Sequence, residues 1–200
     1  MRRLLISFTI ITLGLISYSQ TNEKNQVDLS CYLFKNKVFQ SKRLDGVGYV
    51  QDGKGIRFGF QYSRLLKEKI WLNTGLGFLR ATNEYPVGYS DPSITPYYIS
   101  FHTDIYQIPI RIRYDMLNWL YFKSGLTIDI QTNNKEGVYL DNQSGVGFSF
   151  ICGFALKITK SLLFIIEPEL GVTRLNPFHR NKYPQHFLLT GITFNIGYLF

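Results

Sequence analysis

The sequence predicts an all-β protein: an up-and-down antiparallel transmembrane β-barrel of about eight strands that follows a cleaved signal peptide. Three observations lead to this fold class. Aromatic residues make up 16% of the chain while mean hydropathy is only −0.05. Apolar and polar residues alternate with period two in repeated segments, and the links between these segments are alternately long and short.

Composition and charge exclude several classes of protein. The 200 residues suffice for one domain and include 16 Phe, 14 Tyr and 17 Gly. A helical membrane protein would have strongly positive mean hydropathy, and soluble α/β domains seldom carry so many rings. The net charge is +8, but Lys and Arg are scattered without a basic helix, zinc pattern or RNA-binding motif. We therefore expect no nucleic acid partner and a solvated basic surface, for which facing anionic lipid headgroups is one option.

The N-terminus has the three parts of a secretory signal. Arg2 and Arg3 are followed by an apolar run over residues 4–16 and by the small residues Ser17 and Ser19. The run is shorter than the roughly 20 residues of a membrane-spanning helix, and polar residues follow at once. The sequence thus predicts a signal peptide over 1–19 and an outer-membrane barrel domain over 20–200.

The strand pattern is clearest in the last segment, 188–200, where large apolar residues occupy one face and small or polar residues the other. Its outward face consists of Leu188, Thr190, Ile192, Phe194, Ile196, Tyr198 and Phe200. The same split recurs over 27–33, 56–63, 70–78, 107–115, 120–131, 146–157 and 162–173, and it is weakest in the first. Together these segments make about eight strands.

Polarity and links favour a barrel over a soluble sandwich. Charges on the apolar face, such as Arg64, Arg80, Asp104 and Arg174, lie at strand ends, as expected where a mid-membrane charge costs roughly 2–4 kcal/mol. The long links are 35–54, 81–100, 133–143 and 175–186, and the short ones are 66–69, 116–118 and 159–161. Short periplasmic turns and long outer loops alternate in this way in outer-membrane barrels, so we expect that location.

Three groups of residues refine the barrel prediction. Rings near the short turns indicate an interfacial girdle: Tyr62, Trp71, Tyr114, Trp119, Tyr198 and Phe200. Pro109 and Pro168 interrupt strands, so we expect a β-bulge or local widening at each. Cys31 and Cys152 fall on apolar faces of strands that are not neighbours, so we expect two free thiols.

Several motifs carry a resemblance to a known family. The string 106–114, which contains Ile108-Pro109-Ile110, is the most specific of them. With 75–77, 167–169 and the terminal Tyr198-Leu199-Phe200, it resembles the PorT-like outer-membrane β-barrel family of Bacteroidota over nearly all of the mature chain. The resemblance implies the barrel fold and explains the strand prolines. Some members of the family serve type IX secretion, and many have no assigned role. The resemblance therefore assigns no functional residue to this sequence.

The terminal strand implies one partner. A final Phe200 after alternating hydrophobic residues looks like the signal that barrel-assembly machinery recognises. Other expected partners are outer-membrane lipid and a surface protein or secretion-system component. Tyrosines in the long links could serve as contact anchors: Tyr85, Tyr89, Tyr97, Tyr98, Tyr139 and Tyr183.

Charged residues on the non-apolar face are predicted to plug the interior, because eight strands leave a lumen that side chains can fill. The basic members are Arg57, Arg111, Arg113 and Lys123, and the acidic ones are Asp115, Asp129, Glu167 and Glu169, with Gln61, Gln107 and Gln131 beside them. Opposite charges in such a space should pair, since an unpaired buried charge is very costly. A narrow pore is the alternative.

Catalysis and metal binding are weakly supported. Ser100, His102 and Asp104 share a strand face, but residues two apart lie roughly 6.5 Å from each other, which is awkward for a nucleophile and its base. His179 and His186 stand amid positive charge without a carboxylate or cysteine. We expect no catalytic, cofactor or metal site. The predicted function is a structural or interaction barrel for surface display, with an outer-membrane lipid-modifying enzyme or a narrow pore as alternatives.

Overall fold

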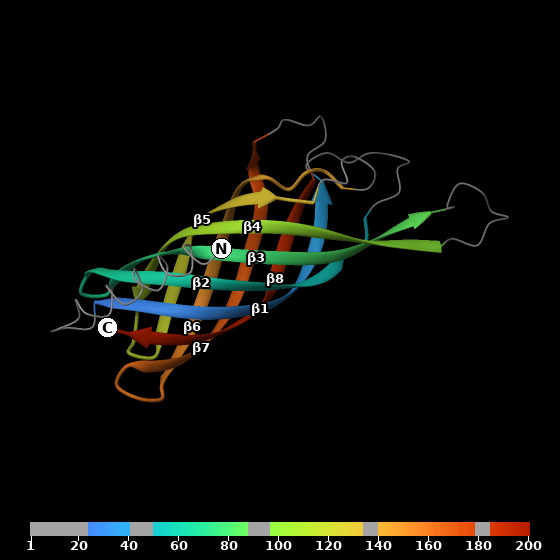
Figure 1. Ribbon diagram of the computed structural model, residues 1–200. Coiled ribbons are helices and arrows are strands. Elements are labelled where there is room, and N and C mark those ends of the chain that lie inside the picture. The colour runs from blue at the N-terminus through green and yellow to red at the C-terminus, as the bar shows by residue number, and fades with distance from the viewer. Residues whose placement is uncertain (1–23, 41–49, 88–96, 134–139, 179–184) are drawn as a thin grey trace, which may run out of the picture.

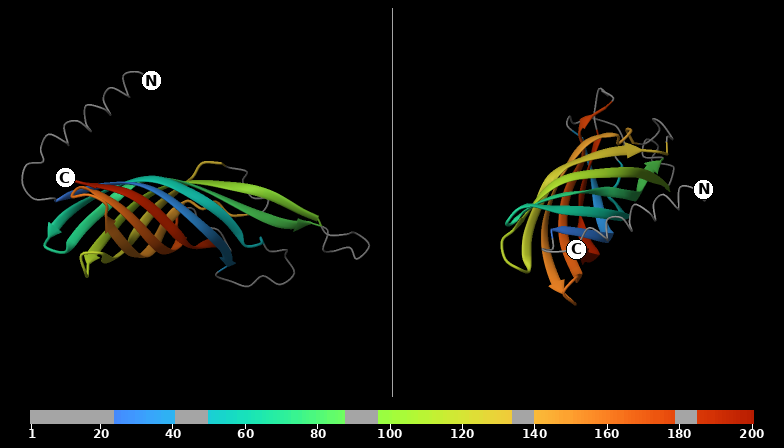
Figure 2. Two further views of the ribbon diagram at one scale, coloured as in Figure 1. Left: turned by 90° about the horizontal axis from the view of Figure 1, so that it is seen from below. Right: turned by 60° about the vertical axis from the view of Figure 1, so that its left-hand side comes forward.

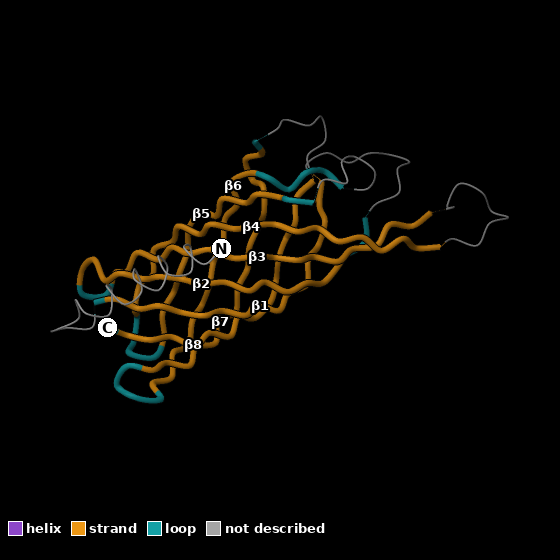
Figure 3. The backbone as a smooth tube through the Cα atoms, in the orientation of Figure 1, coloured by secondary structure: helices purple, strands orange, loops and turns teal. Residues whose placement is uncertain are grey.

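The computed structural model describes residues 24–40, 50–87, 97–133, 140–178 and 185–200. Eight antiparallel strands close into one barrel in sequence order. Figures 1 and 3 show the strands wound around the barrel axis. They are β1 (Asn25–Gln40), β2 (Gly53–Lys67), β3 (Ile70–Val87), β4 (Tyr97–Asp115), β5 (Leu120–Gln131), β6 (Gly145–Lys157), β7 (Leu162–Pro177) and β8 (Gln185–Leu199). The predicted fold class is confirmed.

Period-two alternation sets the inside and outside of the wall. On β6, Phe148 and Phe150 are exposed, while Ser149 and Ile151, which alternate with them, are buried. The other strands follow the same rule, so an apolar belt surrounds the barrel and polar side chains fill much of its interior. This is the arrangement of outer-membrane barrels.

The barrel closes between its first and last strands. β1 pairs with β8 from Gln26↔Leu199 to Gln40↔Gln185. At the short-turn end, the Asn25 amide donates to the Phe200 carbonyl and the Phe200 amide donates to the Asn25 carbonyl, both at 2.9 Å. Closure leaves no free strand edge within the belt, as lipid requires.

The strands extend further on the long-link side than predicted. Residues 81–100 were predicted as a link, but β3 continues to Val87 and β4 begins at Tyr97, so that the two form a long hairpin. In Figures 1 and 2 this hairpin projects beyond the other strands. Outside the membrane neither face needs to be apolar, so the alternation that reveals a strand is lost there.

The two strand prolines open the ladder without shifting it. Between β3 and β4, pairing stops after Thr74↔Ile110 and resumes in the same register at Gly77↔Gln107, around Pro109. The ladder of β6 and β7 is interrupted in the same way around Pro168. Of the two predicted forms, local widening is therefore confirmed, and the bulges lie elsewhere, between Leu65 and Lys67 and between Val146 and Phe148.

Two side chains lie on the opposite face from the predicted one. Arg174 was placed on the apolar face but is buried, because its positive φ of 56° and the nearby register shift let it follow buried Thr173 inward. Trp71 was placed in the interfacial girdle but is also buried. Its indole Nε1 donates to Asp115 Oδ2 at 2.7 Å inside the short-turn end.

Other predictions have simpler outcomes. Tyr114, Trp119 and Tyr198 are exposed near the short turns, as the girdle requires. Cys31 and Cys152 are free, as predicted. The predicted signal peptide, 1–19, lies outside the described residues. No described helix is long and apolar enough to cross a membrane.

Candidate functional site

The lumen is layered along the barrel axis, and the inward residues of β8 show the order. From the long-link end, Phe187 and Leu189 come first, then polar Thr193 and Asn195, and finally Leu199. The outer apolar layer consists of Tyr32, Phe34, Leu79, Ala81, Ile105, Phe187 and Leu189. The periplasmic apolar layer consists of Trp71, Tyr121, Ala155, Leu163, Ile165 and Leu199. Charged side chains fill the space between them.

Glu169 of β7 is the centre of the charged layer. Arg57 of β2 donates from Nη1 to Glu169 Oε1 at 3.0 Å and from Nη2 to Oε2, a bidentate contact across the lumen. Arg111 of β4 donates to Glu169 Oε1 at 3.3 Å, and Thr193 donates to Oε2 at 3.2 Å. One carboxylate thus joins β7 to two strands on the far side of the barrel.

Glu167, two residues away on the same face, pairs with a different cation. Lys123 Nζ of β5 lies 2.7 Å from Glu167 Oε1 and also donates to Gln61 at 3.2 Å. The Tyr121 hydroxyl donates to the same carboxylate, and Asn195 donates to Oε2 at 3.0 Å. Pro168 between the two glutamates points outward and is exposed. The Glu-Pro-Glu motif therefore supplies two inward carboxylates from one short segment.

Two amide side chains each connect an arginine of the lumen to a further carboxylate. Gln107 accepts from Arg57 at 3.1 Å and donates to Asp129 at 2.7 Å. Gln26 donates to Asp28 at 2.6 Å and accepts from Arg113 at 2.8 Å. Each of the two amides is hydrogen-bonded both to an arginine and to a carboxylate, and these two charged groups do not pair directly.

Aromatic faces cover two of the arginines. The Arg57 guanidinium lies 4.5 Å from the centroid of the Tyr32 ring. Arg113 lies 3.9 Å from the Tyr121 ring and 5.2 Å from the Trp71 ring. Cation–π contacts of this kind stabilise a guanidinium that has left water. They also join the charged layer to both apolar layers.

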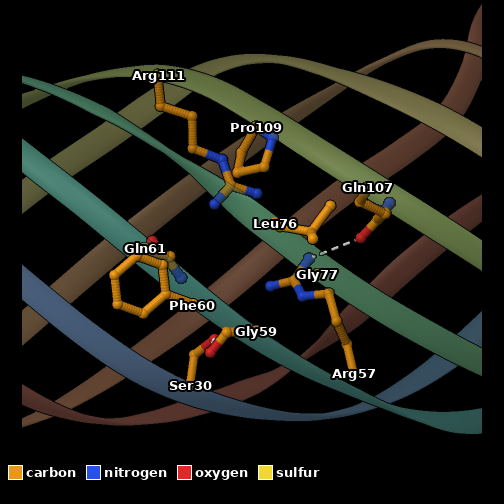
Figure 4. A pocket seen from close by; sticks show the side chains of 10 residues that line it. All are labelled: Ser30, Arg57, Gly59, Phe60, Gln61, Leu76, Gly77, Gln107, Pro109 and Arg111. Carbon is orange, nitrogen blue, oxygen red and sulfur yellow. Dashed lines mark hydrogen bonds between the residues drawn. The ribbon is translucent and has the colours of Figure 1, made fainter. Parts of the chain in front are cut away.

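The cavity drawn in Figure 4 lies beside Arg57 and Arg111, where the β3–β4 ladder opens at Pro109. Its volume is about 10 Å³. A cavity needs roughly 10–15 Å³ to hold one water molecule, so this space is too small for a hydrated ion.

Seven of the eight charges predicted to face inward are buried; Asp115, whose side chain is 25% exposed, is the other one. Asp28 and Arg174 are also buried and were not among the eight. Asp28 lies on the polar face of the segment 27–33, where the alternation of apolar and polar residues is weakest. That alternation is the only sequence signal that could have predicted its inward position. Arg174, which lies 3.3 Å from Asp141, turns inward through a local backbone irregularity that alternation does not reveal.

The residues weighed for catalysis make separate contacts. His102 Nδ1 lies 2.9 Å from the Thr82 hydroxyl. Asp104 accepts from Arg80 Nε at 2.7 Å and Nη2 at 2.9 Å. Ser100 lies on the same exposed stretch of β4. The carboxylate is engaged by an arginine, and no hydrogen bond orients His102 toward Ser100 among the described residues.

The histidines weighed for metal binding are not brought together by the described structure. His186 is buried, with Nδ1 3.0 Å from the Arg174 carbonyl, and His179 lies outside the described residues. Within the ranges that the structure describes, no group of three or more His, Cys, Asp or Glu side chains could hold a metal ion.

Of the predicted contact tyrosines, three lie in described strands. Tyr97 and Tyr98 are exposed at the start of β4, and Tyr85 lies on β3 opposite Ile99. The others, Tyr89, Tyr139 and Tyr183, fall outside the described residues. The tyrosines of the hairpin therefore belong to a sheet and not to a link.

The closed barrel and its apolar belt are those of an outer-membrane protein, and the protein is located in that membrane. No protein-family model matches the sequence, and no curated protein matches it. Solved structures that are similar include the outer membrane protein OprG from Pseudomonas aeruginosa, at 13% identity and a TM-score of 0.47, covering 88% of this chain and 96% of that one. The Ail protein of Yersinia pestis, solved with a heparin analogue, has 9% identity, a TM-score of 0.42, and 86% and 99% coverage. AlkL in lipid bilayers has 14% identity, a TM-score of 0.46, and 91% and 92% coverage. These values are too low to transfer a function.

Proposed function

We propose that this protein is a non-conducting outer-membrane barrel that anchors a surface hairpin for contact with another protein. The observation that carries the proposal is the combination of a packed, charge-paired lumen with a long hairpin outside the belt. The resemblance to PorT-like barrels favours a secretion-system component as the partner. Recognition of the final strand, ending in Phe200, by barrel-assembly machinery belongs to the same proposal.

The lumen supports a structural role over transport. An ion crossing it would have to displace two apolar layers and break the pairs that join Glu167 to β5 and Glu169 to β2 and β4. Breaking such a buried pair costs about 3–5 kcal/mol, because an uncompensated charge is left in a dry site. This cost supports the proposal of a closed resting lumen.

The hairpin supports contact with a partner. β3 pairs with β4 out to Val87↔Tyr97, whereas β2 leaves β3 after Lys54↔Thr82 and β5 leaves β4 after Ile105↔Gln131. The outermost part therefore has no neighbouring strand on either side among the described residues. Exposed strand edges can pair with an added strand, and exposed tyrosines such as Tyr98 can anchor an interface.

Planar-bilayer recordings of the refolded protein test the closed lumen. We expect no large, stable open-channel steps from the unmodified chain, and rare openings when Glu167→Ala and Glu169→Ala are combined. Exposed Glu68→Ala is the matched control and should stay silent. Large steady currents from the unmodified protein would establish the narrow-pore alternative.

A photo-crosslinking residue tests the contact surface in cells that make the protein. Tyr98, which is 47% exposed on the hairpin, is replaced in one strain, and Tyr106, which is 43% exposed within the belt of the same strand, in another. We expect a discrete protein adduct at position 98 and none of that mass at position 106. Equal products at both positions would mean that the hairpin has no partner of its own.

A lipid-modifying enzyme is not favoured by the contacts of its candidate residues. Asp104 is held by Arg80 and His102 by Thr82, so neither is positioned to activate Ser100. We therefore propose no catalytic role for this group.

A further inference from the structure

Three lysines face outward at the long-link end of the barrel. Lys35 and Lys37 lie two residues apart on the same face of β1, and Lys54 lies on the adjacent strand β2. All three are exposed, and together they line a groove of about 620 Å³ on the outside of the wall. We refer to them as the lysine cluster.

The strand register places these charges against one another. Lys35 and Lys54 are directly opposite across the β1–β2 ladder. Like charges in this position destabilise a pair of strands. In the remainder of the cluster, Lys37 stands beside Leu188 of β8 and brings no compensating charge. An anion bound between the lysines would attract each ammonium group and offset their mutual repulsion.

The cluster stands directly above the apolar belt. The next outward residues toward the membrane are Leu33 and Ile56, which are paired with each other, and Leu33 is 50% exposed to lipid. The opposite end of the barrel carries the short turns, so the cluster lies at the level of the outer-leaflet headgroups. An amphiphile could place its acyl chains on the belt and its headgroup in the groove.

The acids near the cluster do not neutralise it. Asp52 and Glu84 also line the groove, but each stands further from the belt than Lys54. Asp52 lies two residues before Lys54, just ahead of β2, and Glu84 lies two residues beyond Thr82 on β3. None of the ion pairs formed among the described residues involves a lysine of the cluster. Outward-facing Arg80 differs, because Asp104 holds it in a bidentate pair.

We infer that the lysine cluster binds the phosphate groups of an outer-leaflet glycolipid. A lysine ammonium is a compact point charge suited to phosphate, and three of them can surround a phosphate from two strands. Continuity with the belt favours a lipid over a soluble anion. The site is independent of the closed lumen and of the hairpin. The inference can therefore be refuted or supported without any consequence for the proposed function.

The test measures lipid binding by native mass spectrometry of the full protein, refolded in detergent. The probe is diphosphoryl lipid A, with dephosphorylated lipid A as the reference lipid. The variant carries Lys35→Gln, Lys37→Gln and Lys54→Gln. The matched control loses three exposed lysines at the short-turn end, through Lys67→Gln, Lys157→Gln and Lys160→Gln. Heat-dependent gel mobility confirms that both fold.

Each lysine near an anionic surface contributes about a fivefold gain in affinity, from roughly 1 kcal/mol and a tenfold change per 1.4 kcal/mol. We expect the cluster variant to bind diphosphoryl lipid A about 100-fold more weakly than the parent, with the control unchanged. Binding of the dephosphorylated lipid should be equal in all three proteins. An equal loss in the control, or no loss in the cluster variant, would overturn the inference. Complete displacement of the lipid by millimolar inorganic phosphate would identify a soluble anion as the occupant instead.

Discussion

Replacing Glu169 by Gln removes one negative charge from the lumen while it keeps the size of the side chain. The carboxylate accepts from Arg57 through both oxygens and from Arg111 and Thr193. An amide keeps one acceptor oxygen, and it presents a donor where the other oxygen accepted. Two buried guanidinium groups would then face each other without their shared counter-ion.

The size of the expected loss in the free energy of unfolding depends on the contacts that each arginine keeps. Arg57 keeps the Tyr32 ring and Gln107, and Arg111 keeps Ser149. Removing one partner of a buried pair costs about 3–5 kcal/mol, and these remaining contacts argue for the lower part of that range. We therefore expect a loss of about 3 kcal/mol in the free energy of unfolding, which is roughly a hundredfold shift in the folding equilibrium.

Urea titration in lipid vesicles, followed by tryptophan fluorescence, measures this loss. Exposed Glu68→Gln serves as the control for removal of a carboxylate, and its stability should match the parent. Adding Arg57→Met to Glu169→Gln should recover part of the loss, because one unpaired charge is removed. A Glu169→Gln protein within about 0.5 kcal/mol of the parent would refute the view that the pairs hold the lumen together.

Three further outcomes follow from the structure. Deleting Phe200 removes the backbone pair that ends the closing ladder, so the heat-modifiable folded form should fall sharply in outer-membrane fractions, and normal levels would count against this. Gly153→Ala should cost about 1–3 kcal/mol in the same urea assay, since its Cβ would lie against the Tyr121 ring. Gly171→Ala, where the nearest atom is 3.7 Å away, should be neutral, and equal effects would contradict the packing argument. His102→Ala should leave lipid A acylation unchanged by mass spectrometry, and a lost or retained acyl chain that depends on His102 would favour the enzyme alternative.

Much of the barrel could be predicted because the membrane imposes a strict contrast between the two faces of each strand. β5 has the predicted bounds, Leu120–Gln131, since both of its ends lie where that contrast ends. The contrast also identified Arg57, Lys123 and Glu169 as lumen residues. Alternation fixes the face of a residue without reference to any distant part of the chain.

The remaining features depend on contacts that alternation cannot specify. The hairpin beyond Thr82 lies outside the apolar belt, where the contrast between the two faces is lost, and Pro86 within it favours a link over a strand. Arg174 faces inward through a positive φ that no neighbouring residue predicts. The choice of Lys123 for Glu167, and of Arg57 for Glu169, depends on the tilt of strands that are two and three places apart around the barrel.

The distribution of charge among the strands has a consequence for the order of assembly. The cations Arg57, Arg111 and Lys123 belong to β2, β4 and β5, while both of their carboxylate partners are in β7. A nascent barrel that has inserted only its first six strands would expose these three cations toward its unfinished interior without the carboxylates that pair with them. Such a partial sheet is not a stable resting point in hydrocarbon. The hairpin of β7 and β8 therefore carries both the carboxylates that pair with these cations and the strand that closes the ring.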